Sequence, residues 1–186
     1  MPIMNFYITF RTFSVCGLML LATGCVKDQD FDQTDEIVFT PEIETDLVYL
    51  QLTQDNFVNS SGEAEVSFVS QTTNLNFIRD GFVQNDLSRI DFTFDTANSF
   101  RQPFNTIVTF LDEAGQVTYE FSFFVPASGT GETVSNTYVE SIMGDDLQRF
   151  KNAVSLQVSS SIILSEFPIM GTLDFQSKAR LYFEFN

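Results

Sequence analysis

Short stretches in which apolar and polar residues alternate dominate the chain from about residue 37 to its end. In 89–95, Ile90, Phe92 and Phe94 alternate with polar residues, which places the three apolar side chains on one face of an extended strand. This period of two predicts half-buried strands. Similar runs occur at 46–52, 65–70, 155–164, 172–175 and 179–185.

The segment 106–126 predicts a β-hairpin. Two strand-like runs flank the turn 112–115, and a type I turn followed by Gly115 in the left-handed region suits such a short loop. The alternate positions from Val117 to Val125 are apolar or aromatic and share one face of the second strand. Pro126 cannot donate a ladder hydrogen bond and is expected to end that strand. The following residues, 127–136, predict a loop.

One short helix is predicted at 144–154. Asp145 is the expected N-cap and Gln148 follows it by three residues, which is the spacing of a capping box. Leu147, Phe150 and Val154 fall on one face, which would pack on a sheet.

These elements predict an all-β domain, an antiparallel β-sandwich of immunoglobulin-like architecture with seven or eight strands, over residues 37–186. Of the 22 phenylalanines, 19 lie after residue 24, which predicts an aromatic core. A small outer-membrane barrel has a similar number of strands. The absence of Trp for interfacial girdles and the shortness of several strands favour the sandwich.

The first 24 residues are typical of a secretory signal peptide. Arg11 is their only charge, an apolar run follows at 12–21, and small residues occupy 22–24. The apolar run is too short to span a bilayer as a helix. Residues 26–36 contain five acids and one aromatic residue, a composition that predicts a flexible tether. We therefore expect a signal peptide at 1–24, an acidic tether at 25–36 and the folded domain at 37–186.

The stretch Leu21-Ala22-Thr23-Gly24-Cys25 resembles the lipobox of bacterial lipoprotein precursors, with Ala22 at a position where Leu is more usual. The resemblance implies that the thiol of Cys25 receives a diacylglyceryl group. The type II signal peptidase then cuts between Gly24 and Cys25, and the new amino group is acylated. The implied partners are the lipoprotein-processing machinery and a membrane, which two or more acyl chains hold stably.

The residues after the cysteine resemble the export signals of Bacteroidetes and flavobacterial surface lipoproteins. Lys27, Asp28 and Asp30 match the pattern, with Asp32 as a weaker member. This resemblance implies display on the outer face of the outer membrane. The alternative is a periplasm-facing lipoprotein of a glycan-binding or transport assembly, with an ordinary spacer after Cys25.

The composition restricts the chemistry. A net charge of −16 repels phosphate backbones and excludes nucleic-acid binding. The chain has no His, so catalytic triads and imidazole–zinc sites are absent. The run Asp28-x-Asp30-x-Asp32 imitates an EF-hand loop but lacks its glycine and its last glutamate, so no metal or cofactor is expected.

These features predict a non-catalytic binding or structural subunit whose partner is a glycan or an envelope protein. The enzymatic alternative is a hydrolase that uses paired carboxylates. Among the tyrosines, Tyr138 lies in the most loop-like surroundings and is the candidate glycan platform; the alternative is a half-buried tyrosine at a strand end. Asp95-Thr96-Ala97 resembles the O-glycosylation sequence of Bacteroidetes, which implies a glycan on Thr96.

Overall fold

The computed structural model describes residues 40–61, 63–64 and 68–185. The predicted signal peptide and tether lie outside the described residues. The same holds for the predicted processing, lipidation and export positions, which are Gly24, Cys25, Lys27, Asp28, Asp30 and Asp32.

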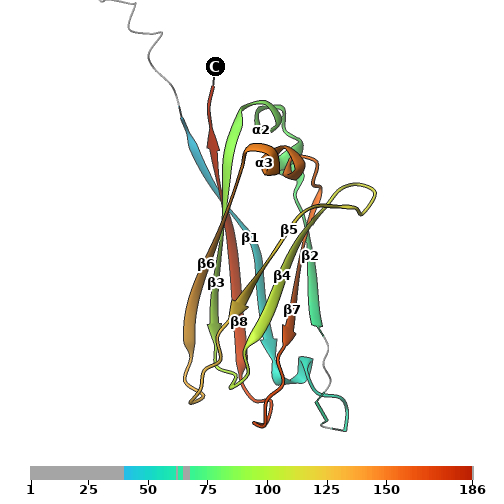
Figure 1. Ribbon diagram of the computed structural model, residues 1–186, viewed down its shortest axis with the longest axis vertical. Coiled ribbons are helices and arrows are strands. Elements are labelled where there is room, and N and C mark those ends of the chain that lie inside the picture. Colours follow the sequence, from blue (N-terminus) through green and yellow to red (C-terminus); the bar gives the residue numbers. More distant parts are fainter. Residues whose placement is uncertain (1–39, 62, 65–67, 186) are drawn as a thin grey trace, which may run out of the picture. The chain divides into compact units, whose positions relative to one another are not determined.

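Eight strands in the described residues form two sheets of four, which face each other as two layers (Figure 1). The first sheet has the order β1 (Glu42–Thr53), β8 (Thr172–Phe183), β3 (Leu87–Asn98), β6 (Val134–Met143). The second sheet has the order β2 (Phe68–Asn74), β7 (Ser155–Ile162), β4 (Phe104–Leu111), β5 (Val117–Val125). Every neighbouring pair is antiparallel, and the predicted antiparallel β-sandwich is confirmed.

The strand order is that of a jelly roll. The first strand pairs with the eighth, the second with the seventh, the third with the sixth and the fourth with the fifth. The chain is thus one long hairpin rolled into two layers, and the β3–β8 and β4–β7 pairs complete the sheets. Two linked Greek keys of this kind define the jelly roll. The immunoglobulin-like description therefore holds for the sandwich and its layers, while the strand order differs from the immunoglobulin order.

This topology separates the two ends of the domain. The start of β1 and the end of β8 lie at the same end as α2 (Gly81–Asp86) and α3 (Gly144–Phe150), which we call the helix end (Figure 1). The β1–β2, β3–β4, β5–β6 and β7–β8 connections lie at the opposite end, which we call the loop end.

The core between the sheets is aromatic, as the sequence predicted. Ile90, Phe92 and Phe94 of β3 are fully buried, and the ring centroid of Phe94 lies 5.3 Å from that of Phe123 and 5.7 Å from that of Phe175. The buried phenylalanines among the described residues are Phe57, Phe92, Phe94, Phe100, Phe104, Phe110, Phe123, Phe150, Phe175 and Phe183.

The predicted strands are largely confirmed, with two differences. The hairpin is β4 and β5, Gly115 has a φ of 73°, and β5 ends directly before Pro126. The segments 172–175 and 179–185, predicted as separate strands, fall in the single strand β8, which ends at Phe183. No strand was predicted at 134–143, where β6 lies, so the loop predicted at 127–136 is shorter and ends before Val134. These two differences offset each other in the strand count.

The helical predictions need three corrections. The helix α3 is present and buries Leu147 and Phe150, but it ends at Phe150, so Val154 lies outside it. Its N-cap is Met143, without a side-chain cap, so the capping box at Asp145 is wrong. The physical reason is that β6 leads into the helix without an intervening loop, through Gly144 at a φ of 59°. A second helix, α2, was not predicted, because six residues are too few for a helical period to be recognised.

Two 3-10 segments, η2 (Gln54–Asn56) and η3 (Asn76–Arg79), complete the helices and strands of the described residues. Across the described part of the chain, no helix has the length and apolar character needed to cross a membrane.

Candidate functional site

The outer face of the first sheet carries most of the charged contacts in the sandwich. The even-numbered residues 90–94 of β3 enter the core, so Arg89, Asp91 and Asp95 point outward. The strand register places Asp91 opposite Arg180 of β8, and Arg180 opposite Glu44 of β1. Charges of opposite sign therefore follow one another across three neighbouring strands, an arrangement that favours cross-strand pairing.

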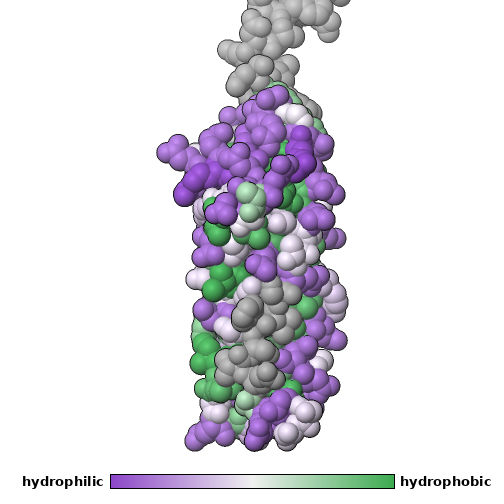
Figure 2. Space-filling model, turned by 90° about the vertical axis from the view of Figure 1, so that its right-hand side faces the viewer, coloured by the Kyte–Doolittle hydropathy of each residue, from purple (hydrophilic) through white to green (hydrophobic). Residues whose placement is uncertain are grey.

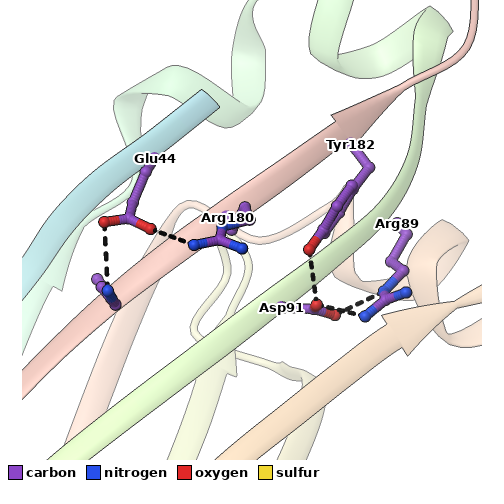
Figure 3. Close-up of polar contacts among 6 residues, drawn as sticks. Glu44, Arg89, Asp91, Arg180 and Tyr182 are labelled. Atoms are coloured by element: carbon purple, nitrogen blue, oxygen red, sulfur yellow. Dashed lines mark hydrogen bonds and ion pairs between the residues drawn. The ribbon is translucent and has the colours of Figure 1, made fainter. Parts of the chain in front are cut away.

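Glu44 holds two cations of β8. Its two carboxylate oxygens lie 3.3 Å from Nζ of Lys178 and 3.0 Å from Nη2 of Arg180 (Figure 3). Hydrogen bonds from Arg180 and then from Lys178 lower the pKa of Glu44, and the hydrogen bond to Glu44 raises the pKa of Arg180. All three side chains are partly exposed, so the network fixes their positions at the surface.

Asp91 is the least exposed charge of this face, at 9% of its surface. It accepts hydrogen bonds from Arg89 Nε, at 2.7 Å, from Arg89 Nη2, and from the hydroxyl of Tyr182, at 3.1 Å (Figure 3). The guanidinium of Arg89 also lies over the ring of Tyr182, 4.7 Å from its centroid. Burial alone would raise the pKa of Asp91, but hydrogen bonds from Arg89, Ser141 and Tyr182 outweigh it and lower the pKa.

Three adjoining depressions follow one another over this face, and we call them together the trough. Their volumes are about 420, 180 and 390 Å³. The first and second share Asp95, and the second and third share Gln176. The two larger depressions fall in the size range of small-molecule sites. The main outward side chains that line the trough are Glu44, Asp46, Tyr49, Asp91, Thr93, Asp95, Thr137, Val139, Asp174, Gln176, Lys178, Arg180 and Tyr182.

Tyr49 is the exposed aromatic residue of the trough. It lies on β1 opposite Gln176, and 62% of its surface is exposed. Sequence reasoning selected Tyr138 and missed Tyr49, although the signal was available. Val48, Leu50 and Leu52 alternate as core residues, so Tyr49 between them must point outward.

Tyr138 is half-buried within β6, and its ring lies inside the sandwich. The ring stacks on Phe123 with a centroid distance of 4.7 Å and an interplanar angle of 9°. Its hydroxyl donates to Glu140 at 2.7 Å, and the hydroxyl of Tyr119 donates to the other oxygen of Glu140 at 2.6 Å. Desolvation and these hydrogen bonds raise the pKa of Tyr119 and raise that of Tyr138 to about 12. Tyr138 closes the edge of the sandwich and offers no platform to a ligand.

Thr96, the residue in the glycosylation-like sequence, faces the interior. Only 3% of its surface is exposed, and its hydroxyl donates to the carbonyl of Asn136 at 3.2 Å. A glycan on Thr96 would therefore require modification of the chain before it folds.

The electrostatics of Glu44 and Asp91 differ from those of a general acid. A general acid at neutral pH needs a raised pKa, whereas the pKa values of Glu44 and Asp91 are lowered. Within the described residues, no group of three or more His, Cys, Asp or Glu side chains could hold a metal ion. What the trough offers is a surface of positioned hydrogen-bond donors and acceptors.

The outer face of the second sheet has a different character. Its central strands present mainly small neutral side chains, such as Ser159, Ser161 and Asn105, with Ile107 and Phe124 exposed among them. Figure 2 looks at the side on which this sheet lies in Figure 1. On this side of the domain, pale and hydrophobic residues are spread from one end to the other, and the most strongly hydrophilic residues gather near the helix end.

Comparisons with known proteins assign no family to the chain and find distant structural similarities. No protein-family model matches the chain, and no curated protein matches its sequence. The domain is similar to a candidate secreted protein from Parabacteroides distasonis, with a TM-score of 0.48 and 11% identity over 62% of this chain and 37% of that one. It is also similar to VP2 of infectious bursal disease virus, with a TM-score of 0.48 and 7% identity over 78% of this chain and 33% of that one.

A weaker similarity joins the domain to the enzymatically active domain of tailspike protein 4 of bacteriophage CBA120. The TM-score is 0.37 and the identity 13%, over 80% of this chain and 19% of that one. The chain thus spans little more than a third of these proteins at most. At these scores the similarities carry no argument about function.

Proposed function

We propose that the protein is a lipid-anchored lipoprotein, displayed on the outer face of the outer membrane as a non-catalytic binding subunit. The trough on the outer face of the first sheet is its binding surface. The anchor is Cys25, and the export signal comprises Lys27, Asp28, Asp30 and Asp32.

The observation that carries the binding role is the continuity of the trough. Three depressions share lining residues on one face, and their side chains are held in place by hydrogen bonds and ion pairs between neighbouring strands. A sheet positions such groups more rigidly than a loop does. The pKa values of Glu44 and Asp91 are lowered by their hydrogen bonds, which supports binding over a general-acid role for these two carboxyls.

The topology supports presentation of this surface to the exterior. The chain enters β1 at the helix end, so a tether that precedes β1 attaches the domain there. The loop end lies at the opposite end of the domain from the start of β1. The acidic tether and the net charge of −16 also repel an anionic membrane surface.

Protease treatment of intact cells tests the location. We expect loss of the domain without lysis, and full protection of the wild-type protein would contradict surface display and favour the periplasm-facing alternative. The triple variant Lys27→Ala, Asp28→Ala, Asp30→Ala should remain lipidated yet become protected from the protease.

A second experiment tests the lipid anchor. Cys25→Ser should abolish both the incorporation of labelled palmitate and the partitioning of the protein into detergent. A Cys25→Ser variant that still partitions like the wild type would refute the anchor.

A further inference from the structure

We propose that the trough binds a neutral, polyhydroxylated glycan chain, with Tyr49 as the stacking platform. This inference rests on the proposed binding function and names its ligand class. Three properties of the trough support it: its charge, its hydrogen-bonding groups and the exposed aromatic ring of Tyr49.

The charges of the trough disfavour an ionic ligand. Five carboxylates and two cations line it, so a polyanion would be repelled. The two carboxylates with lowered pKa values are already opposed, Glu44 by two cations of β8 and Asp91 by Arg89. At Glu44 and Asp91 a cationic ligand would have to compete with these internal partners, and polylysine in the test below probes the other three carboxylates. A neutral ligand leaves the ion pairs intact.

The remaining hydrogen-bonding capacity suits hydroxyl groups. Asp95 accepts from Thr137 at 2.6 Å, and Asp174 accepts from Gln51 at 2.7 Å, so both carboxylates are oriented and keep further lone pairs. The exposed amide of Gln176 on β8, opposite Asp95 and two residues after Asp174, both donates and accepts. Sugar hydroxyls also donate and accept, and neighbouring hydroxyls on one ring can engage two such groups at once.

Tyr49 supplies the apolar contact that a sugar ring needs. Its ring makes no hydrogen bond or ring contact with the described residues, and it stands at one end of the trough opposite Gln176. The C–H face of a pyranose can cover such a ring, which removes apolar surface from water on both partners. The trough is open at the surface, so a chain longer than the trough can lie across it.

A protein partner fits this face less well. Interface cores are depleted in charge and enriched in aromatic residues. Here the large exposed apolar side chains are Tyr49, Val139 and Met143, and charged residues separate them. Binding of a basic peptide is therefore treated as an outcome of the test.

The test is affinity electrophoresis of the full-length protein in a polyoxyethylene detergent, which carries no sugar head group. The gels contain dextran, laminarin, xylan or galactomannan as neutral polysaccharides, alginate as a polyanion, or no additive. We expect retardation by at least one neutral polysaccharide and none by alginate. Tyr49→Ala should weaken that interaction about tenfold or more, since it removes the aromatic ring that the bound sugar would cover. Gln176→Ala should weaken it less.

Phe124→Ala is the matched control, because it removes an aromatic side chain of 55% exposure from the outer face of the second sheet. It should bind as the wild type does, and thermal unfolding should show that all variants are folded. Absence of retardation by every neutral polysaccharide would refute the proposal. So would equal binding by Tyr49→Ala, or salt-sensitive binding of polylysine in place of polysaccharide. Protease treatment of cells measures display independently, so a displayed protein that binds no glycan refutes only this inference.

Discussion

The edge of the sandwich between β5 and β6 should make the protein sensitive to alkali. Tyr119 of β5 and Tyr138 of β6 donate to the two oxygens of Glu140, which bridges the second sheet to the first. Ionisation of either phenol would place two negative charges in contact and remove a donor. Burial and Glu140 therefore raise the pKa of both tyrosines, that of Tyr138 to about 12.

The sign of the effect follows from linkage. A pKa that is higher in the folded state stabilises the fold fully below the unfolded value, about 10 for tyrosine, and this contribution is lost as the pH rises through the folded value. For Tyr138 the rise to about 12 corresponds to about 2–3 kcal/mol, since one pKa unit is about 1.4 kcal/mol. Against a typical domain stability of about 5–15 kcal/mol, this loss should be readily measured.

Urea unfolding at a series of pH values from 8 to 12 measures it. We expect the free energy of unfolding of the wild type to fall steeply above pH 10. Tyr138→Phe should be less stable at pH 8 by about 1.5–3 kcal/mol, the value of a hydrogen bond to a charged group. Above pH 10 it should lose correspondingly less than the wild type. Tyr49→Phe is the control, because it removes an exposed phenol and should follow the wild-type curve. A Tyr138→Phe curve parallel to the wild type over the whole range would refute the reasoning.

Three further perturbations test the core and the trough. Phe94→Ala should lower the free energy of unfolding by about 3–5 kcal/mol, because the ring is fully buried among other phenylalanines; a loss below about 1 kcal/mol in urea would contradict this packing. Deletion of residues 179–186 should give unfolded or insoluble protein by circular dichroism, because it removes part of a central strand together with the buried Leu181 and Phe183; a cooperative thermal transition in the truncated chain would contradict it. Asp91→Asn should cost about 1–3 kcal/mol at pH 7, and the difference from the wild type should disappear as the pH falls through the lowered pKa of Asp91; a difference that persists at acid pH would exclude the charge as its cause.

The sequence predicted the strands whose two faces differ most in hydropathy. In β3, fully buried apolar residues alternate with outward polar ones, and the pattern can be read locally. β6 was not predicted. It is an edge strand, and its inward positions include the polar residues Asn136, Tyr138 and Glu140. Polar residues on both faces leave no period of two to recognise.

The jelly-roll order could not be predicted from local patterns. It depends on pairings between distant segments, such as Glu44 with Arg180 and Asp91 with Arg180. Alternation alone indicates that each of these side chains points outward. Register decides which of them meet, and register is fixed by the packing of the whole core. For this reason the trough emerged only from the folded structure, although alternation within the predicted strands places Tyr49, Asp91 and Arg180 on an outer face.

The distribution of basic residues gives the two outer faces different roles. Seven arginines and lysines lie in the described residues, and Arg89, Lys178 and Arg180 gather on the outer face of the first sheet. In a chain with a net charge of −16, these three cations offset part of the negative charge that the carboxylates give this face. Long-range repulsion then keeps anionic surfaces at a distance, while the trough itself presents paired charges and directed hydrogen bonds. In the binding role that we propose, such a face would discriminate by the geometry of its hydrogen bonds and by the exposed ring of Tyr49, as recognition of an uncharged ligand requires.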